Sequence, residues 1–379
     1  MIPLSETHFS GNEWKYVKEC LDTGWVSSVG HFVSEFEKKI AEYVGVKHAV
    51  ATVNGTSALH VALRALGVGQ GDEVLVPTLT FVATANAVNY CGAVPLFMDC
   101  VPNTLCLDLE KVSDFLASET EQKRDGYRYN KNTKQRIKAI IPVHLFGHAV
   151  DMAPLIGLCE KYRIAIVEDA CESLGTIYQG QQTGSFGHVG CFSFNGNKII
   201  TTGGGGMVVA RDEKLTNRIR HLVTQAKKGG LDYFHDEIGF NYRLSNMQSA
   251  LGVAQLENLG RFIEVKRKNA LLYRDLLKEM DIEMIWEPPD TQSNFWFYTI
   301  RVPQGHKDSL LQWLISKDIQ VRSVWNPLHL LPIYASCQSY RVETANNVFN
   351  QCINLPCSVT LTEADIEFVS DMIFQYFKK

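Results

Sequence analysis

The sequence predicts an α/β protein with a mostly parallel central sheet in a large domain, followed by a smaller α+β domain. Its 379 residues, 45% of them hydrophobic, are enough to bury the cores of two closely associated domains. Short apolar runs alternate with amphipathic stretches in the first half, as in parallel sheets covered by helices. Mixed strand-like and helix-like segments follow in the last third. We expect the large domain to span residues 1–250 and the small domain residues 251–379.

The alternation that predicts the large domain begins after Val46. Compact apolar runs favour buried strands, and apolar residues at helical spacing favour helices. The expected strands are residues 48–53, 73–77, 94–98, 137–143 and 164–168, and the expected helices are residues 58–66, 82–90 and 152–162. The polar and charged segment 118–136 is predicted to be an exposed excursion.

The character of the sequence changes after Gly190. Residues 191–194 and 207–210 are strand-like, and the four glycines at 203–206 between them indicate a turn or a close backbone approach. A helical pattern then runs from Met247 toward Met280 and is expected to link the two domains. In the small domain we expect a strand at 295–302 and helices at 307–315 and 363–377.

Composition excludes several classes of function. Thirty-seven basic and 41 acidic side chains give a formal charge of −4, so we expect no nucleic-acid partner. The N-terminus lacks a basic region followed by an apolar stretch, and no segment is apolar for long enough to span a bilayer, so we expect a cytoplasmic protein without a membrane partner. The ten cysteines form no C-x-x-C pair, which predicts reduced thiols and no metal site.

The first candidate site is the segment Asn-Gly-Thr-Ser-Ala-Leu at residues 54–59, between an expected strand and an expected helix. Gly55 permits a tight turn. The free N–H groups at a helix start, together with the Thr56 and Ser57 hydroxyls, suit a bound phosphate. Plain capping of the helix is the competing interpretation.

Two further candidates are Asp169 and Lys198. Asp169 follows an expected strand, and ligands collect at the carboxyl ends of strands in α/β sheets. A carboxylate there can keep a pyridine nitrogen protonated, although it can also cap the next helix. Lys198 has no acidic neighbour within several positions. Burial lowers the pKa of a lysine amine and makes it a nucleophile that can form a Schiff base with an aldehyde, whereas most lysines are solvated surface charges.

Taken in order, the three candidates provide what pyridoxal 5'-phosphate requires of a protein. The phosphate must be anchored, the ring nitrogen must be kept cationic, and the aldehyde must be held by an amine. The sequence therefore predicts pyridoxal 5'-phosphate as the cofactor.

The sequence also resembles the DegT/StrS-type sugar aminotransferases, which are fold-type I pyridoxal-phosphate enzymes. The resemblance covers nearly the whole chain, and its blocks occur in the family's order. They are residues 23–27, 54–59, 71–74 with Pro77, 80–84, 168–170, 193–198, 239–243 and 327–329. The fold that the resemblance implies is that of a fold-type I aminotransferase.

The resemblance implies a role for each matched residue. Lys198 is similar to the catalytic lysine that bonds to the cofactor, and Asp169 to the acid beside its ring nitrogen. Phe81 is similar to the ring that stacks on the cofactor, although a core position is the alternative. Asn241 resembles a residue that reaches the phosphate in the partner subunit, which implies a homodimer with shared active sites. The other implied cofactor contacts are Gly55, Thr56, Ser57, Glu172 and Ser193.

Two positions depart from the family's usual pattern. Glu172 stands where many relatives carry a neutral glutamine or histidine beside the cofactor's phenolic oxygen, so this carboxylate must be protonated, solvated or turned away. Glycines at 203–206 replace the usual Gly-Glu-Gly-Gly, so any role of that acid is absent. Relatives of the legionaminic acid and bacillosamine pathways, which act on nucleotide-linked 4-keto-6-deoxy-N-acetylhexosamines, are similar in both features.

The implied reaction moves an amino group from an amino acid, glutamate, to C4 of UDP-4-keto-6-deoxy-N-acetylglucosamine. GDP- and dTDP-4-keto-6-deoxyhexoses are competing substrates. Trp25 and His329 are candidate substrate contacts, with ordinary packing as the competing interpretation.

Sugar dehydratases with the same cofactor carry histidine at the lysine position, so Lys198 argues against that reaction. Two further functions compete on the same scaffold, those of a lyase acting on amino acids and of a non-catalytic regulatory protein.

Overall fold

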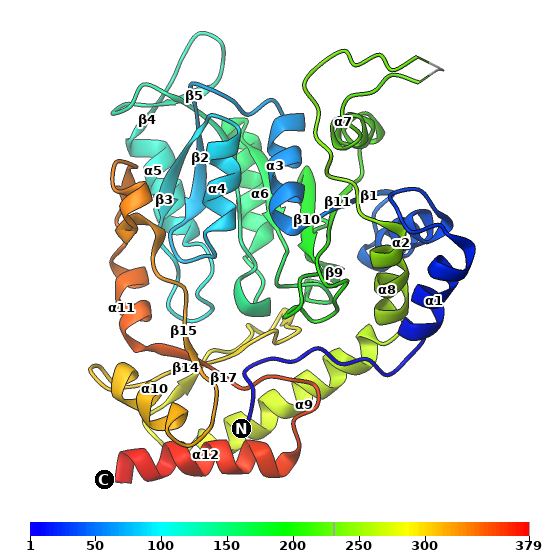
Figure 1. The fold of residues 1–379 in the computed structure, drawn as a ribbon. Coiled ribbons are helices and arrows are strands. Elements are labelled where there is room, and N and C mark those ends of the chain that lie inside the picture. The colour runs from blue at the N-terminus through cyan, green and yellow to red at the C-terminus, as the bar shows by residue number, and fades with distance from the viewer. Residues whose placement is uncertain (230–231, 379) are drawn as a thin grey trace.

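The computed structural model describes residues 1–229 and 232–378 and contains a large domain built on one extended sheet (Figure 1). The strand order along this sheet is β1-β11-β10-β7-β6-β2-β3-β16. The neighbours from β10 to β16 in this order pair in parallel, whereas β11 is antiparallel to both β1 and β10. The predicted mostly parallel sheet is confirmed. These strands are β1 (His48–Thr52), β2 (Asp72–Pro77), β3 (Val94–Met98), β6 (Arg136–Ile140), β7 (Ala165–Asp169), β10 (Val189–Ser193), β11 (Gly206–Ala210) and β16 (Ser339–Tyr340).

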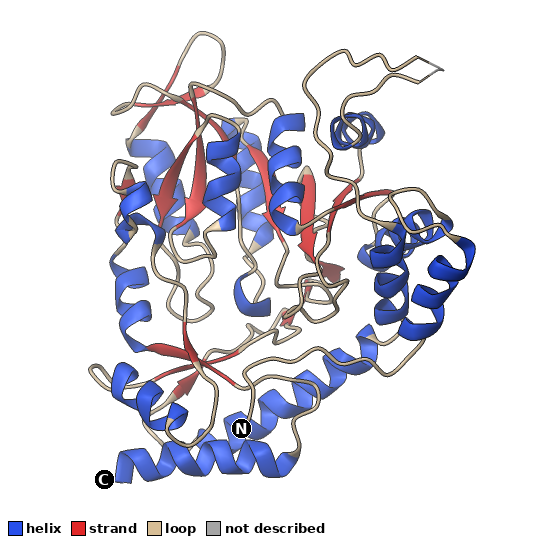
Figure 2. Ribbon diagram, viewed as in Figure 1, coloured by secondary structure: helices blue, strands red, loops and turns tan. Residues whose placement is uncertain are grey.

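Helices that follow the strands pack against this sheet (Figure 2). Those in direct contact with its strands are α3 (Gly55–Ala65), α4 (Ala83–Tyr90), α6 (Met152–Tyr162) and α7 (Glu213–Val223). A second group of helices packs together beside β1, namely α1 (Glu13–Thr23), α2 (His31–Val44) and α8 (Asn246–Leu256). The core of the large domain lies between the sheet and these helices. No helix within residues 1–229 and 232–378 is long and apolar enough to cross a membrane.

Most predicted elements occur close to their expected positions, and β3 and α6 have the predicted bounds. Two segments differ in detail. The polar excursion 118–136 contains a hairpin of β4 (Thr120–Gln122) and β5 (Arg128–Asn130), preceded by α5 (Leu109–Ser118). The long helical pattern after Met247 forms two helices, because α8 ends at Leu256 and α9 (Leu259–Leu277) begins after a break.

The small domain contains an antiparallel sheet of order β12-β14-β17-β15. Helix α10 packs on this sheet, and α12 packs on α9 and α10. The N-terminal residues also lie here, since Ile2 bridges Ile319 and the Cys357 N–H donates to the Leu4 carbonyl. The division predicted at residues 250/251 falls inside α8 and stays a prediction. The elements are β12 (Glu283–Met284), β14 (Tyr298–Arg301), α10 (Lys307–Ile315), β15 (Arg322–Ser323), α11 (Glu343–Gln351), β17 (Cys352–Leu355) and α12 (Glu363–Lys378).

Short elements connect the two domains. A three-stranded sheet of order β13-β8-β9 pairs one strand of the small-domain part of the chain with two strands of the large-domain part. Three 3-10 turns complete the described structure. These elements are η1 (Leu145–Gly147), β8 (Ile177–Tyr178), β9 (Gln181–Gln182), β13 (Thr291–Gln292), η2 (Leu328–Leu330) and η3 (Pro332–Tyr334).

Glu168, near the end of β7, organises the loop that leads into β10. Its fully buried carboxylate accepts hydrogen bonds from the backbone N–H groups of Gly184 (2.7 Å), Phe186 (2.7 Å) and Gly187 (2.6 Å). The imidazole Nε2 of His144 lies 3.0 Å from the same carboxylate. A buried carboxylate with this many donors ties the loop 184–187 and His144 to the end of β7.

We expect Glu168→Ala to lower the free energy of unfolding by about 3–5 kcal/mol, because it leaves several buried donors without an acceptor. Urea titration of both proteins measures the difference. Glu213→Ala, at an exposed position of α7, is the control and should change stability by less than about 0.5 kcal/mol. Equal midpoints for Glu168→Ala and Glu213→Ala would contradict the structural role of Glu168.

Candidate active site

A cavity of about 340 Å³ lies at the carboxyl ends of β7 and β10, beside the first turn of α3. These two strands are parallel, with Cys191 opposite Asp169, so the residues that follow them meet at one edge of the sheet. The structure thus brings together residues that are far apart in the sequence. The predicted site residues that line the cavity are Gly55, Thr56, Phe81, Asp169, Glu172, Ser193 and Lys198.

The start of α3 forms one wall of the cavity. The side chain of Asn54 caps this helix, accepting a hydrogen bond of 2.8 Å from the Ser57 N–H. A Cβ atom on Gly55 would lie 2.8 Å from Cβ of Ser193 and 2.9 Å from Sγ of Cys171, which is closer than real contacts allow. The Asn54 cap of this helix is thus present in the structure. The Thr56 side chain still lines the cavity, and the start of the helix remains open to a ligand.

Asp169 presents a buried carboxylate at the end of β7. Its Oδ2 accepts a hydrogen bond of 2.7 Å from the Thr84 hydroxyl, and its Oδ1 accepts one of 3.2 Å from the Cys171 N–H. The segment after β7 forms turns, so Asp169 is not the cap of a following helix. Both carboxylate oxygens are oriented by these donors, which fixes the direction in which the charge points.

Lys198 lies in the turn that follows β10, where its backbone N–H donates to the Asn195 carbonyl. Its side chain is only 13% exposed, and Nζ lies 3.7 Å from Oε1 of Glu172. On another side Nζ lies 3.7 Å from the centroid of the Trp296 ring. The alternative of a solvated surface lysine does not hold, because this amine is enclosed by an acid and an aromatic face.

Glu172 is the unusual acid of this cavity. Burial raises the pKa of its carboxyl to about 7, against the lowering effect of the nearby Lys198 charge. Its Oε2 accepts a hydrogen bond of 2.8 Å from the Phe146 N–H. Glu172 is buried and faces Lys198, so the solvated state predicted for this side chain does not occur, and its contact with the cofactor stays a prediction. Burial favours the protonated form of the carboxyl and the Lys198 ammonium favours its charged form, so both forms occur near neutral pH.

The raised pKa of Glu172 predicts a pH-dependent stability of the cofactor-free protein. Folding raises this pKa from 4.5 to about 7, so the folded state holds the extra proton between these values and loses stability as the pH rises through them. The loss is on the order of 3 kcal/mol. Glu172→Gln has no carboxyl to titrate at this position. Between pH 5 and pH 8 its free energy of unfolding should therefore rise relative to that of the wild type. Parallel pH profiles in urea titrations would contradict the raised pKa.

Four predicted site residues do not line the cavity within this chain. Ser57 is buried in α3, and the Asn241 side chain is exposed and accepts hydrogen bonds from Arg243. Trp25 is 57% exposed. His329 places Nδ1 2.7 Å from the Thr78 hydroxyl, next to the end of β2. Their assigned roles stay predictions.

Several residues that the sequence did not single out also line the cavity. Thr84 belongs to the block 80–84, and its hydroxyl binds Asp169. Trp296 and Trp325 come from the small-domain part of the chain, where no local motif marks them. The residues not predicted include Thr84, Asn195, Asn197, Trp296 and Trp325.

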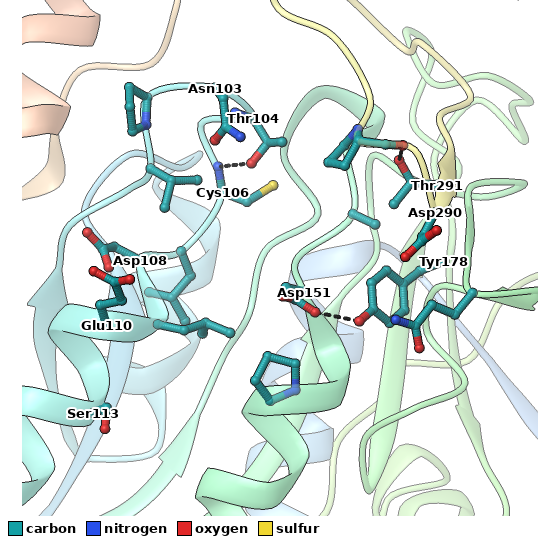
Figure 3. Close-up of a pocket in the computed structure, with 18 of the residues that line it drawn as sticks. Asn103, Thr104, Cys106, Asp108, Glu110, Ser113, Asp151, Tyr178, Asp290 and Thr291 are labelled. Carbon is teal, nitrogen blue, oxygen red and sulfur yellow. Dashed lines mark hydrogen bonds between the residues drawn. The ribbon is translucent and has the colours of Figure 1, made fainter.

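A larger cavity of about 1370 Å³ lies elsewhere on the molecule (Figure 3). It is lined in part by the loop that precedes α5 and by residues 288–291. Its charged lining residues are all acidic, and it contains no lysine. It therefore lacks an amine that could bond to a carbonyl compound. The charged residues there are Asp108, Glu110, Asp114, Asp151 and Asp290.

A buried amine beside carboxylates, at the carboxyl ends of parallel strands, is typical of an enzyme that binds a carbonyl compound through a lysine. The DegT/DnrJ/EryC1/StrS aminotransferase family matches residues 8–374, and the chain belongs to this family. A GDP-perosamine synthase of Caulobacter vibrioides is 39% identical, over 97% of this chain and 96% of that protein. Another, from Vibrio cholerae, is 38% identical over 100% and 99%. The crystal structure of a DegT DnrJ EryC1 StrS aminotransferase from Brucella abortus matches with a TM-score of 0.90, at 30% identity, over 97% of this chain and 96% of that one.

The protein is therefore an aminotransferase, and pyridoxal 5'-phosphate is its cofactor. The residues of the cavity fit this group. Lys198 offers a largely enclosed amine, Asp169 an oriented carboxylate, and Gly55 a helix start that no Cβ obstructs. An aldehyde, a ring nitrogen and a phosphate need these three kinds of partner.

Proposed function

We propose that this enzyme transfers an amino group from glutamate to the C4 keto group of a nucleotide-linked 4-keto-6-deoxy sugar. The observation that carries the proposal is the largely enclosed Lys198 amine, in one cavity with Asp169 and Glu172, in a chain of this family. The names of the two relatives, GDP-perosamine synthases, support a nucleotide-linked sugar as the substrate class.

In this proposal Lys198 bonds to the cofactor and, once released, acts as general acid and base. Its Nζ removes a proton from the α-carbon of the amino-acid donor and later delivers one to C4 of the sugar. Both transfers require an amine that is screened from bulk water and held near the reacting carbon. The low exposure of the Lys198 side chain supports this role.

When bound, pyridoxal 5'-phosphate takes up the electron pair left on carbon as the proton leaves. Asp169 is proposed to keep the ring nitrogen protonated, and the donors from Thr84 and Cys171 support it by orienting the carboxylate. The half-exposed ring of Phe81 is proposed to stack on the cofactor ring. The residues proposed to hold the phosphate are Gly55, Thr56, Ser57 and Ser193.

The nucleotide of the proposed substrate is UDP, carried on 4-keto-6-deoxy-N-acetylglucosamine. A GDP-linked 4-keto-6-deoxyhexose is the second candidate, favoured by the names of the two relatives. In the test, enzyme loaded with pyridoxal 5'-phosphate is supplied with glutamate and with a UDP-, GDP- or dTDP-4-keto-6-deoxy sugar. The aminated product is followed by mass spectrometry. We expect the highest kcat/KM with the UDP sugar. A kcat/KM that is tenfold higher with the GDP sugar than with the UDP sugar would make the GDP sugar the substrate. Absence of product with every sugar would refute the proposed function.

We also propose a homodimer in which each subunit contributes to the site of the other. Large apolar side chains are exposed near Asn241, as expected of a surface that a partner covers. They lie in the segment that projects from the large domain between α7 and α8 (Figure 1). The exposed residues are Tyr233 (85%), Phe234 (58%) and Ile238 (84%).

Mixing of two inactive variants tests the shared site. Lys198→Ala lacks the reactive amine, and Asn241→Ala lacks the group proposed to reach the partner's phosphate. In a mixed dimer, one site carries both defects and the other carries neither. Unfolding and refolding the two variants together should therefore restore about a quarter of wild-type activity, if subunits pair at random. Sites contained in single subunits would give no such recovery.

A cytoplasmic location is part of this proposal. All ten cysteines are free thiols in the structure, as expected in a reducing compartment. An amino-acid donor and a nucleotide-linked sugar are both proposed to reach the enzyme there.

A further inference from the structure

The Lys198 amine is held from two sides in this structure. Nζ lies 3.7 Å from the centroid of the Trp296 ring and 3.7 Å from Oε1 of Glu172. Both neighbours favour a positively charged amine, one through the face of its ring and the other through its carboxylate.

The Trp296 ring is fixed in place. The side chain is buried, and its indole N–H donates a hydrogen bond of 2.7 Å to the Asn197 carbonyl, next to Lys198 itself. The Trp296 carbonyl accepts a hydrogen bond of 3.1 Å from the buried amine of Lys266, which also donates to the Cys357 carbonyl at 2.6 Å. These contacts anchor the ring at both its side chain and its backbone, so it is a rigid surface for the amine.

Glu172 is fixed by a matching set of contacts. Its Oε2 accepts the Phe146 N–H at 2.8 Å, and Phe146 holds a left-handed backbone conformation (φ 54°, ψ 18°) in the turn η1. With Oε2 accepting this N–H, Oε1 is the oxygen left to face Lys198. A non-glycine residue in this conformation is uncommon and occurs where the surrounding structure imposes it.

One buried side chain joins the two holding groups. Asn294 Oδ1 accepts the Trp296 N–H at 2.9 Å, and Asn294 Nδ2 donates to the Glu172 carbonyl at 3.1 Å. Asn294 therefore links the two backbone segments that carry the aromatic face and the carboxylate. Such a buried hydrogen-bonded link favours one fixed arrangement of the two segments.

We propose that Trp296, together with Glu172, forms a holding site for the Lys198 ammonium whenever the lysine is released from the cofactor. Trp296 is then a positioning residue, which keeps Nζ beside the reacting carbon through the half of the cycle in which Lys198 is free. This inference rests on the role proposed above for Lys198. It adds an aromatic contact, supplied by the small-domain part of the chain, to the reaction carried out in the large domain.

The test measures the free lysine directly, in enzyme loaded with pyridoxamine 5'-phosphate, the cofactor form that has no aldehyde for Lys198 to bond. Acetic anhydride labels neutral, accessible amines, and peptide mass spectrometry follows the rate at which Lys198 is labelled at a fixed pH. An ammonium that is held and covered is labelled more slowly than a free amine. The variants are Trp296→Leu, which removes the aromatic face, and Trp296→Phe, which keeps a face but loses the indole N–H.

We expect Trp296→Leu to speed the labelling of Lys198 about tenfold, because the ring that covers the amine is lost. Its kcat should fall about tenfold, and Trp296→Phe should return both the labelling rate and kcat close to the wild-type values. Trp286→Leu is the control, because Trp286 packs against Phe295 outside the cavity and should leave the labelling rate unchanged. Glu172→Gln, which removes the carboxylate from the other side, should also speed the labelling.

A labelling rate that stays at the wild-type value in Trp296→Leu would overturn the holding site, as would a Phe variant that behaves like the Leu variant. Failure of the underlying function has a different signature. If wild-type Lys198 were labelled equally with pyridoxal phosphate and with pyridoxamine phosphate bound, Lys198 would not be the residue that bonds to the cofactor. The first result leaves the catalytic lysine in place, and the second removes it.

Discussion

Lys198→Ala is expected to lower the rate of amino transfer by at least ~10⁴-fold, the largest effect of any single change in this protein. The variant loses the group that bonds to the cofactor aldehyde and the group that moves protons between the carbon atoms. It should also lose the visible absorbance that pyridoxal 5'-phosphate acquires when bonded to a lysine. Steady-state assays with glutamate and the preferred keto sugar measure the rate, and a spectrum of the purified protein measures the absorbance.

The matched control for this change is Lys268→Ala. Lys268 lies on α9 and pairs with Glu363 on the surface, so its loss should leave rate and absorbance within about twofold of the wild type. Added methylamine should partly restore turnover to Lys198→Ala, because a small amine can enter the space that the side chain leaves. A Lys198→Ala enzyme that turns over at more than one hundredth of the wild-type rate would refute the assignment.

Asp169→Asn is expected to have the second largest effect, a fall in kcat of about 10²–10³-fold. The substitution keeps the size and shape of the side chain, and its amide oxygen can still accept the Thr84 hydroxyl. It removes the negative charge that is proposed to keep the ring nitrogen protonated. The bond between Lys198 and the cofactor does not need this charge, so the visible absorbance should persist. Loss of rate with retained absorbance distinguishes Asp169 from Lys198.

The matched control for Asp169 is Thr84→Val, which removes one hydrogen bond to the carboxylate and leaves the charge in place. A tenfold fall in kcat is the expected order of effect, since one hydrogen bond to a charged group contributes about 1.5–3 kcal/mol at most. Cofactor affinity, measured by absorbance titration, should weaken more in Asp169→Asn than in Thr84→Val. Equal rates for Asp169→Asn and the wild type would show that the ring nitrogen has another partner.

Much of the fold could be predicted because its signals are local. The strand β3 and the helix α6 have the predicted bounds, since an apolar run and a 3.6-residue periodicity depend only on neighbours in the sequence. The break between α8 and α9 has only a weak signal. Asn258 precedes α9 at its N-cap, but a single asparagine also occurs inside helices, so it does not by itself mark the break. The β4–β5 hairpin was hidden in the same way by its polar sequence.

The candidate site could be predicted in part. Gly55, Asp169 and Lys198 stand at the ends of strands or the start of a helix, where sequence patterns mark the positions that face a ligand. Trp296 and Trp325 carry no such mark, because they reach the cavity only through the packing of the small-domain part of the chain. The roles of Asn241, Trp25 and His329 depend on a surface outside this cavity.

By itself the sequence determined the cofactor, the family and the mostly parallel sheet, because each depends on residue types in a recognisable order. Only the tertiary structure decided the environment of the reactive amine. The raised pKa of Glu172 and the ring that covers Lys198 both depend on burial, and burial is a property of groups brought together from distant parts of the chain. A sequence names the ionisable groups, whereas folding sets how much water and which charges surround them.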